Sequence, residues 1–262
     1  MKQTIEYCLL LVILIACSPQ AEEQPHEQSQ ELPIAQKDKI LFIVSNADYY
    51  GTSDIEAANH FHEIILAYDV LAEAGYDIDF VSPDGGAIPI GYIYTSDELT
   101  RKYLYDEVFM NDLEHTLSAD EIDPSDYQAV YYGGGGSAMF GVPENATIQR
   151  ISKEVYEQGG IVSALCHGTA GLAHIQLSSG EYLVADKKVV GFPDLFEDLD
   201  GEYYQQFPFS IEKIIAEHGG NFLYSEEGWD GYVEQDGRLI TGQDPTSAAP
   251  IAERIIQELQ TR

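Results

Sequence analysis

The chain has 262 residues, of which 13 are Lys or Arg and 45 are Asp or Glu, so its formal net charge at neutral pH is −32. So negative a charge repels phosphate backbones, which excludes nucleic acid binding, and it makes an anionic lipid surface an equally poor partner. Apolar residues form 44% of the chain, which suits a buried core and excludes a disordered or fibrous protein. Composition and charge alone therefore predict a globular protein that diffuses freely.

The first twenty residues indicate a different location. The apolar run over residues 7–16 is shorter than the roughly 20 residues that a membrane-spanning helix needs, and it has the length of the apolar part of a signal peptide. Residues 14–17, Leu-Ile-Ala-Cys, resemble a bacterial lipobox, in which cleavage precedes the cysteine and a lipid is attached to its thiol. An ordinary secretory signal that contains a cysteine is the alternative.

We therefore expect a lipoprotein signal peptide over residues 1–16, then a lipidated Cys17 and a flexible polar tether up to residue 38. Ser18 directly after the cysteine indicates sorting to the outer membrane, by analogy with enteric lipoproteins. The expected location is the bacterial cell envelope, with the protein facing the periplasm and contacting the membrane only through its lipid.

A folded domain is predicted over residues 39–262, beginning with a short apolar run at 40–45 that is typical of a buried parallel strand. Apolar residues at helical spacing then end at Gly75, where a helix C-cap belongs. The same alternation continues, with strands expected at 76–81, 127–132, 161–165, 188–191 and 237–241, and helices within 98–118, 148–160, 168–173, 208–217 and 247–260. This order predicts an α/β fold with a mostly parallel sheet covered by helices on both faces.

Cys166 directly follows the strand expected at 161–165 and precedes His167 and small residues. A sharp turn from strand to helix exposes its middle side chain, and the start of the following helix lowers the pKa of a thiol and supplies N–H donors for an oxyanion. With Cys8 removed and Cys17 lipidated, Cys166 is the free thiol of the mature chain, so no disulfide is expected. A buried cysteine that only fills the core is the alternative.

Four glycines, residues 133–136, follow the strand expected at 127–132. Glycine lets backbone amides approach a ligand closely, whereas a phosphate-binding loop needs wider spacing and a Lys. We therefore predict that Gly134 and Gly135, together with His167, contribute to an oxyanion or substrate-binding site. A merely flexible turn is the alternative.

The segment from Ala164 to Leu172 resembles the nucleophile elbow of the ThiJ/PfpI family, which belongs to the class I glutamine amidotransferase-like superfamily. Other segments resemble the heat-shock chaperone and glutathione-independent glyoxalase branch of this family, and they occur in matching order at 74–76, 81–86, 191–193 and 236–245. The resemblance covers residues 39 to 260. It implies a flavodoxin-like three-layer sandwich.

The resemblance also implies roles for single residues. Cys166 matches the nucleophile and His167 the adjacent histidine of a triad. The third member is an acid shortly after the Gly-Phe strand, which points to Glu197, with Asp194 and Asp198 as alternatives. A buried glutamate that hydrogen-bonds the cysteine matches Glu63, which could donate a proton if burial raises its pKa; a surface carboxylate is the other interpretation.

Two positions depart from the pattern of this branch. Gly135 stands where the branch usually has a histidine, and Asp244 stands where Asn is common. These departures bear on the reaction more than on the fold.

His60 and His62, together with Glu63, form a cluster that could suggest a metal site. We instead expect both histidines at the mouth of a pocket or in solvent, and no metal or cofactor. The eighteen tyrosines are expected at core edges and at the interface of a homodimer, and Trp229 is expected to pack near the site.

The predicted function is a cofactor-free, cysteine-dependent enzyme that acts on small reactive carbonyl compounds. Glyoxalase III-like chemistry converts a 2-oxoaldehyde and water into a 2-hydroxy acid, for example methylglyoxal into lactate. The alternative is an envelope stress chaperone or redox sensor of the same family without turnover, in which Cys166 is oxidised to a sulfinic acid held by Glu63.

Overall fold

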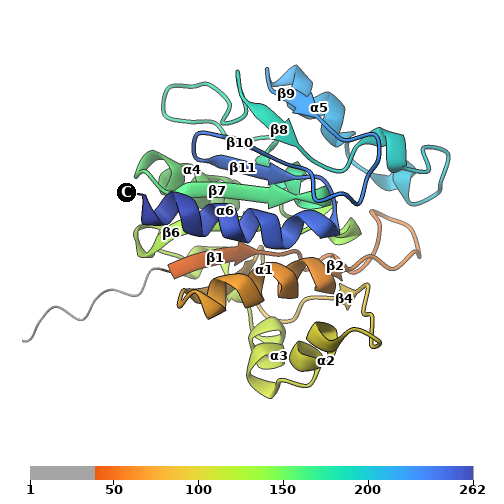
Figure 1. The fold of residues 1–262 in the computed structure, drawn as a ribbon. Helices are drawn as coiled ribbons and strands as arrows, with labels where there is room; N and C mark the ends of the chain where they lie inside the picture. The colour runs from red at the N-terminus through yellow and green to blue at the C-terminus, as the bar shows by residue number, and fades with distance from the viewer. Residues whose placement is uncertain (1–38, 262) are drawn as a thin grey trace, which may run out of the picture. The chain divides into compact units, whose positions relative to one another are not determined.

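The computed structural model describes residues 39–261, and the signal peptide, the lipidated Cys17 and the tether predicted for residues 1–38 lie outside this range. Seven strands form the main sheet in the order β10-β11-β7-β6-β1-β3-β5 (Figure 1). Their bounds are β1 Lys39–Ile43, β3 Asp77–Ser82, β5 Leu117–Ser118, β6 Tyr127–Tyr132, β7 Ile161–Leu165, β10 Val233–Asp236 and β11 Leu239–Gly242. All neighbours pair in parallel except β10, which runs antiparallel to β11.

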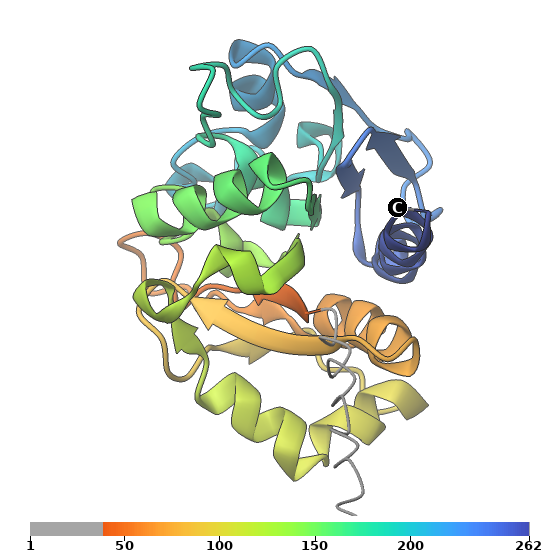
Figure 2. The ribbon, with the colours of Figure 1, turned by 90° about the vertical axis from the view of Figure 1, so that its left-hand side faces the viewer.

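Helices cover both faces of this sheet, as the alternating pattern predicts. The α-helices are α1 Phe61–Glu73, α2 Glu98–Leu104, α3 Glu107–Glu114, α4 Ala146–Glu157, α5 Ile211–Glu217 and α6 Ala248–Gln260. Figure 2 shows α4 on one side of the sheet and α1 with α6 on the other. The result is the expected three-layer α/β sandwich.

The side chains of β1 explain how the sequence builds these layers. Successive residues of a strand point to opposite faces. Ile40 and Phe42 accordingly join the core beneath α1 and α6, whereas Leu41 and Ile43 join the core beneath α4 and α5. A strand buried on both faces is apolar throughout, which is why its sequence signal is a continuous run.

Two smaller parallel pairs lie outside the main sheet. One pairs β2 (Asn59–His60) with β4 (Ile90–Gly91), and the other pairs β8 (Lys188–Val190) with β9 (Asn221–Leu223). The first pair brings the start of α1 next to the loop around residue 90. This arrangement matters for the site because both segments reach its wall.

The strand order reverses between β1 and β6, since β3 and β5 extend the sheet from β1 while β7 and β11 extend it from β6. Ligands of open α/β sheets bind at the carboxyl ends of strands near such a reversal. The four-glycine loop follows β6 and Cys166 follows β7, so both lie at this edge.

The structure corrects some element predictions. The segment after β7 is a 3-10 helix over Cys166–Leu172, not the start of an α-helix at residue 168. The region 98–118 holds α2, α3 and the short β5, and the antiparallel strand β10 is an addition to the predicted elements. None of the helices within residues 39–261 has the length and apolar character to cross a bilayer.

Candidate active site

Cys166 occupies a strained turn at the carboxyl end of β7. Its φ of 54° lies in the left-handed region that residues with a side chain rarely adopt, and a hydrogen bond of 3.3 Å from the Phe192 N–H to the Cys166 carbonyl ties this turn to the segment after β8. The residue is 4% exposed, and its side chain lines a cavity. Such strain persists only where the surroundings enforce it, and it is common at active sites.

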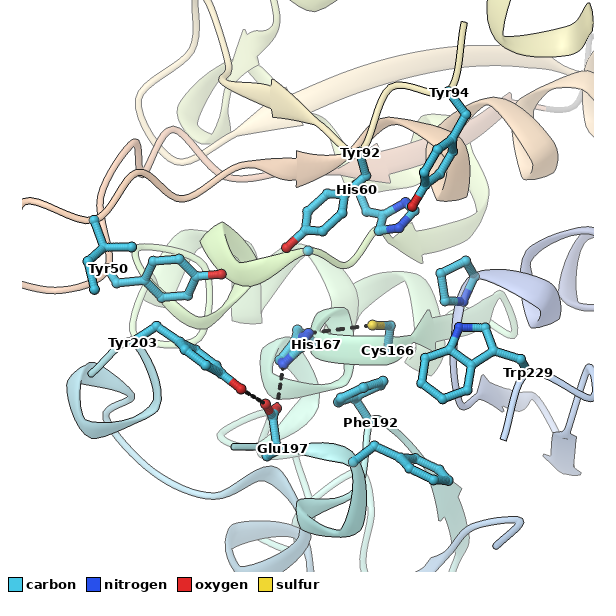
Figure 3. A pocket seen from close by; sticks show the side chains of 14 residues that line it. Tyr50, His60, Tyr92, Tyr94, Cys166, His167, Phe192, Glu197, Tyr203 and Trp229 are labelled. Carbon is cyan, nitrogen blue, oxygen red and sulfur yellow. Dashed lines mark hydrogen bonds and ion pairs between the residues drawn. The ribbon is translucent and has the colours of Figure 1, made fainter. Parts of the chain in front are cut away.

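A chain of side-chain contacts leads away from the cysteine. The Cys166 Sγ lies 3.4 Å from Nδ1 of His167, and Nε2 of the same ring lies 2.7 Å from Oε1 of Glu197 (Figure 3). The Tyr203 hydroxyl donates to the other carboxylate oxygen of Glu197 at 2.9 Å. The structure therefore brings together the three residues that the sequence resemblance singles out, and it adds Tyr203.

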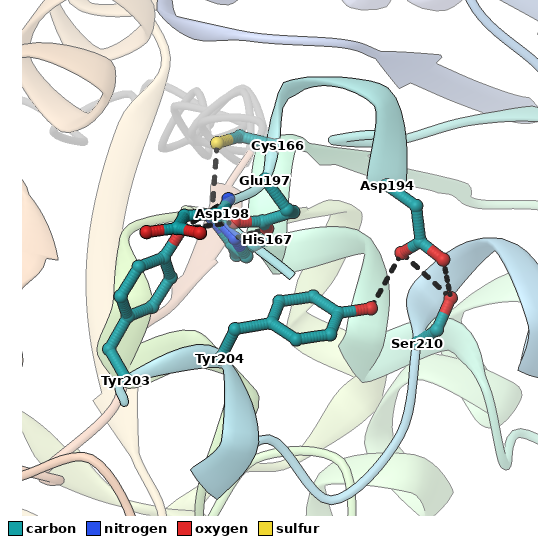
Figure 4. A network of polar contacts seen from close by, with 8 residues as sticks. All are labelled: Cys166, His167, Asp194, Glu197, Asp198, Tyr203, Tyr204 and Ser210. Atoms are coloured by element: carbon teal, nitrogen blue, oxygen red, sulfur yellow. Dashed lines mark hydrogen bonds and ion pairs between the residues drawn. The ribbon is translucent and has the colours of Figure 1, made fainter. Parts of the chain in front are cut away.

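The two alternative acids have other environments. Asp194 accepts hydrogen bonds from the Tyr204 hydroxyl at 2.8 Å and from the Ser210 hydroxyl at 2.9 Å, away from the imidazole (Figure 4). Asp198 is exposed, and its backbone N–H donates to the Tyr203 hydroxyl. Glu197 is thus the acid that contacts His167.

Glu63 projects from the first turn of α1 into the core and is fully buried. Its Oε2 accepts a hydrogen bond from the Gly134 N–H at 2.9 Å, whereas Oε1 has no hydrogen-bond partner among the described residues. Burial raises the pKa of Glu63 to about 8, against the opposing effects of the Cys166 thiol and the Gly134 N–H. The carboxyl beside the thiol is therefore protonated at neutral pH.

The state of the thiol differs from the sequence-based expectation. Burial raises the pKa of Cys166 well above its usual range, charge on Glu63 raises it further, and the N–H groups of His167 and Gly135 oppose this. The expected lowering of the thiol pKa rests on the start of an α-helix, which the structure replaces with a 3-10 helix. Cys166 thus rests as a neutral thiol beside a base.

The four-glycine loop separates into two roles. The N–H of Gly134 is engaged by Glu63 and is not available to a substrate, which corrects its predicted oxyanion role. The backbone of Gly135 opposes the raised pKa of the Cys166 thiol, and Gly135 lines the cavity. Gly135 has a φ of +100°, and a Cβ there would lie 2.4 Å from the Ala58 carbonyl oxygen, so the loop approaches β2 as closely as only glycine allows.

The cavity has a volume of about 470 Å³ and mostly aromatic walls. Aromatic residues from several loops supply these walls, namely Tyr50, Tyr92, Tyr94, Phe192, Phe196, Tyr203 and Trp229. None of the described residues that line it is Lys or Arg. Trp229 packs on Phe196 with ring centroids 5.3 Å apart. The backbone N–H of Trp229 donates a hydrogen bond to the Asp244 carboxylate at 2.7 Å.

The sequence interpretation misses most of this wall. It assigns the tyrosines to core edges and a subunit interface, yet Tyr50, Tyr92 and Tyr203 border the cavity. These residues come from three distant loops that carry no periodic pattern. No signal in the sequence indicates that they meet.

The side chains of His60 and His62, the two histidines before Glu63, lie in different surroundings. His60 lines the cavity, whereas His62 turns to α2, where its Nδ1 lies 3.3 Å from the Thr100 hydroxyl. Within residues 39–261 no group of three or more His, Cys, Asp or Glu side chains is arranged to hold a metal ion.

This fold and site belong to a known class: the chain is a member of the DJ-1/PfpI family, whose model matches residues 55–258. It is 30% identical over 242 residues to the glutathione-independent glyoxalase hsp3102 of Schizosaccharomyces pombe, covering 87% of this chain and all of that protein. It is also 30% identical over 228 residues to glyoxalase 3 of Candida albicans, covering 83% and 97% of the two chains.

Solved structures show the same fold. Rapid Encystment Protein 24 KDa of Francisella tularensis superposes with a TM-score of 0.80 at 29% identity, covering 85% of this chain and 99% of that one. Glyoxalase III of Candida albicans superposes with a TM-score of 0.76 at 26% identity, covering 84% and 97%. The comparisons confirm the family and the flavodoxin-like fold expected from the sequence motifs.

Proposed function

We propose that the protein is a cofactor-free enzyme that converts a small 2-oxoaldehyde and water into a 2-hydroxy acid, with Cys166 as nucleophile. The observation that carries the proposal is the chain of contacts from the Cys166 thiol through His167 to Glu197, opening into a cavity with a protonated carboxyl beside the sulfur. The relatives named glutathione-independent glyoxalase hsp3102 and glyoxalase 3 support it.

The first step forms a bond between sulfur and the aldehyde carbon. His167 Nδ1 takes the thiol proton, the sulfur attacks, and the π electrons of the carbonyl move to its oxygen, which takes the proton back from His167. Glu197 accepts the N–H of Nε2 and so leaves Nδ1 free to act as the base. The product is a neutral hemithioacetal.

The second step moves hydrogen from one carbon to the next. His167 removes the proton from the carbon bonded to sulfur, which leaves an enediolate with its negative charge on the former ketone oxygen. The proton of the hemithioacetal hydroxyl passes to that oxygen, and the protonated His167 gives its proton to the neighbouring carbon, which yields a thioester of the 2-hydroxy acid. Water then attacks the thioester, the C–S bond breaks, and the thiol regains its proton. Throughout, a neutral Glu63 avoids repulsion with the developing thiolate and offers it a hydrogen bond.

The lining of the cavity favours one kind of substrate. Aromatic walls bind apolar groups, and the absence of Lys and Arg from the described lining leaves a carboxylate or phosphate without a counter-charge. We therefore propose an uncharged dicarbonyl compound with an apolar substituent.

Turnover by the purified full-length protein tests the proposal. Methylglyoxal should be converted to lactate, detected by NMR, and Cys166→Ser should reduce the rate to background, whereas Tyr204→Phe, outside the cavity lining, should not. Absence of turnover in the wild type, with equal suppression of aggregation by wild type and Cys166→Ser, would instead support the chaperone alternative.

We also propose that the enzyme works in the cell envelope as a homodimer anchored through a lipid on Cys17. This proposal rests on the lipobox-like sequence at residues 14–17 and on family resemblance.

In a bacterial host, the wild type should fractionate with membranes and incorporate labelled palmitate, and Cys17→Ser should do neither. Equal labelling of both proteins would refute the anchor, and light scattering would decide the dimer.

A further inference from the structure

His60 is a buried histidine of the cavity wall that the mechanism above does not use. It is 6% exposed, forms the N-cap of α1 and lies across the cavity from Cys166 (Figure 3). Its Nδ1 accepts a hydrogen bond from the Glu63 N–H at 3.3 Å. Because Nδ1 must be unprotonated to accept, the ring proton of the neutral imidazole resides on Nε2.

The surroundings keep this imidazole neutral. Burial lowers the pKa of His60 to about 3, and positive charge on His62 and His167 would lower it further. No salt bridge joins the ring to an acid among the described residues, and a backbone hydrogen bond that favours the charged ring has a smaller effect than burial. His60 is therefore a hydrogen-bond donor of fixed tautomer across the physiological pH range.

The position of the ring is also fixed. The ring stacks on Tyr92 with centroids 4.3 Å apart and planes 9° apart. The backbone N–H of His60 donates to the Gly134 carbonyl at 2.9 Å, which holds the residue in place. The glycine loop can lie this close to His60 because Gly135 has no side chain. A Cβ at position 135 would lie 2.5 Å from the backbone nitrogen of His60. Among the described residues no hydrogen bond to Nε2 is found, and Nε2 is not one of the fully buried polar atoms that lack a partner, so this N–H is open to the cavity and can donate to a ligand there.

We propose that the Nε2–H of His60 binds the ketone oxygen of the 2-oxoaldehyde and stabilises the negative charge that this oxygen gains when His167 removes the neighbouring proton. The proposal rests on the proposed function. Cys166 binds the aldehyde carbon in this scheme, and His60 lines the same cavity on the side across from Cys166, where the second oxygen of the substrate can reach it. A neutral donor suits this task because it stabilises the enediolate without giving up its own proton.

Three variants separate catalysis from helix capping. His60→Asn keeps a side-chain acceptor for the Glu63 N–H, since Asn is a favoured N-cap, but is too short to reach the position of Nε2. His60→Gln has an amide long enough to restore a donor. His62→Gln, in the same helix turn but outside the cavity lining, is the matched control.

With methylglyoxal as the probe, His60→Asn should lower kcat by about 100-fold with little change in KM, and His60→Gln should recover part of the loss. The primary isotope effect on kcat with aldehyde-deuterated substrate should rise in His60→Asn, because proton removal becomes more rate-limiting. A purely structural role would lower the melting temperature and leave the isotope effect unchanged.

Any of three results would overturn the assignment. An active wild type with His60→Asn at the same kcat and isotope effect refutes the role of His60 alone. An inactive wild type refutes the proposed function and the assignment with it. If His60→Asn does not fold, the His60→Gln variant decides, since a kcat and isotope effect no closer to wild type than those of a His60→Phe variant contradict a donor role.

Discussion

At the scale of single residues, Glu63 shows how burial determines chemistry. A carboxyl without a cationic partner cannot remain charged in a core, so it retains its proton at a pH where exposed acids have lost theirs. That proton makes the site compatible with a thiolate, because a charged Glu63 would repel it. The backbone N–H of Glu63 also donates to Nδ1 of His60, so the first turn of α1 contacts both the Cys166 thiol and the His60 ring.

The raised pKa of Glu63 also leads to a prediction of how the free energy of unfolding depends on pH. Its pKa is about 8 when folded and near 4.5 when unfolded, so between these values the unfolded chain releases the proton first and the folded state loses stability as pH rises. Glu63→Gln should remove this loss, which amounts to a few kcal/mol at about 1.4 kcal/mol per pH unit. Urea unfolding of wild type and variant at pH 5 and pH 8 checks it; parallel changes in both proteins would contradict the burial argument.

A second prediction at this scale concerns Tyr203, which donates to Glu197 at 2.9 Å and so holds the acid that orients His167. Tyr203→Phe should lower kcat about three- to tenfold with little change in stability. Tyr204→Phe is the matched control, because its hydroxyl binds Asp194 instead. Equal kinetic losses in both variants would show that the hydroxyl of Tyr203 does not act through Glu197.

At the scale of elements, the site depends on how closely the loop after β6 approaches the strand β2. The two segments are joined by the hydrogen bond from the His60 N–H to the Gly134 carbonyl, and Gly135 packs directly on the backbone of residues 58–60. This contact places the His60 ring and the Gly135 amide on one wall. A shift of either segment would separate the proposed donors.

Gly135→Ala should therefore be far more damaging than a glycine replacement that only incurs backbone strain. Gly75 is the matched control, because it has a φ of +93° and a Cβ added there would meet no atom within 4 Å. Its replacement by Ala should cost about 1 kcal/mol, whereas Gly135→Ala should cost about 3 kcal/mol or more, because strain and a backbone clash add. Equal melting temperatures for the two variants would disprove the close approach.

At the scale of the whole molecule, the net charge and the lining of the cavity both disfavour the binding of an anionic substrate. The chain carries a net charge of −32, and no cation lies in the described cavity lining. An anionic substrate is thus repelled at long range and has no partner on arrival. We therefore expect the net charge to disfavour anionic small molecules as substrates.

Phenylglyoxal and its 4-carboxylate derivative test this selection, since they share the reacting dicarbonyl and differ in charge. The carboxylate should react with a kcat/KM lower by about tenfold or more, and added salt should narrow the gap because it screens the repulsion between charges. Equal kcat/KM values at low ionic strength would show that the cavity does not discriminate by charge.

The sequence by itself determined the layers of the fold and the position of the cysteine. Continuous apolar runs such as 40–45 indicate strands buried on both faces, and their alternation with helices requires a parallel sheet, because only crossovers connect parallel strands. The nucleophile elbow is visible in the sequence because Cys166 and its neighbours are adjacent in the chain. Glu197 can be named from motif order, although Asp194 and Asp198 can be set aside only with the structure.

Only the tertiary structure decided the protonation of Glu63 and Cys166 and the composition of the cavity wall. A pKa depends on burial, and burial depends on segments far away in the chain, so no local pattern contains it. Tyr50, Tyr92 and Tyr203 meet because their loops converge at one edge of the sheet, and His60 acquires a fixed tautomer because it caps α1 beside the glycine loop. Periodicity specifies which face a residue takes within an element, whereas the meeting of loops is set by how the whole chain crosses the sheet.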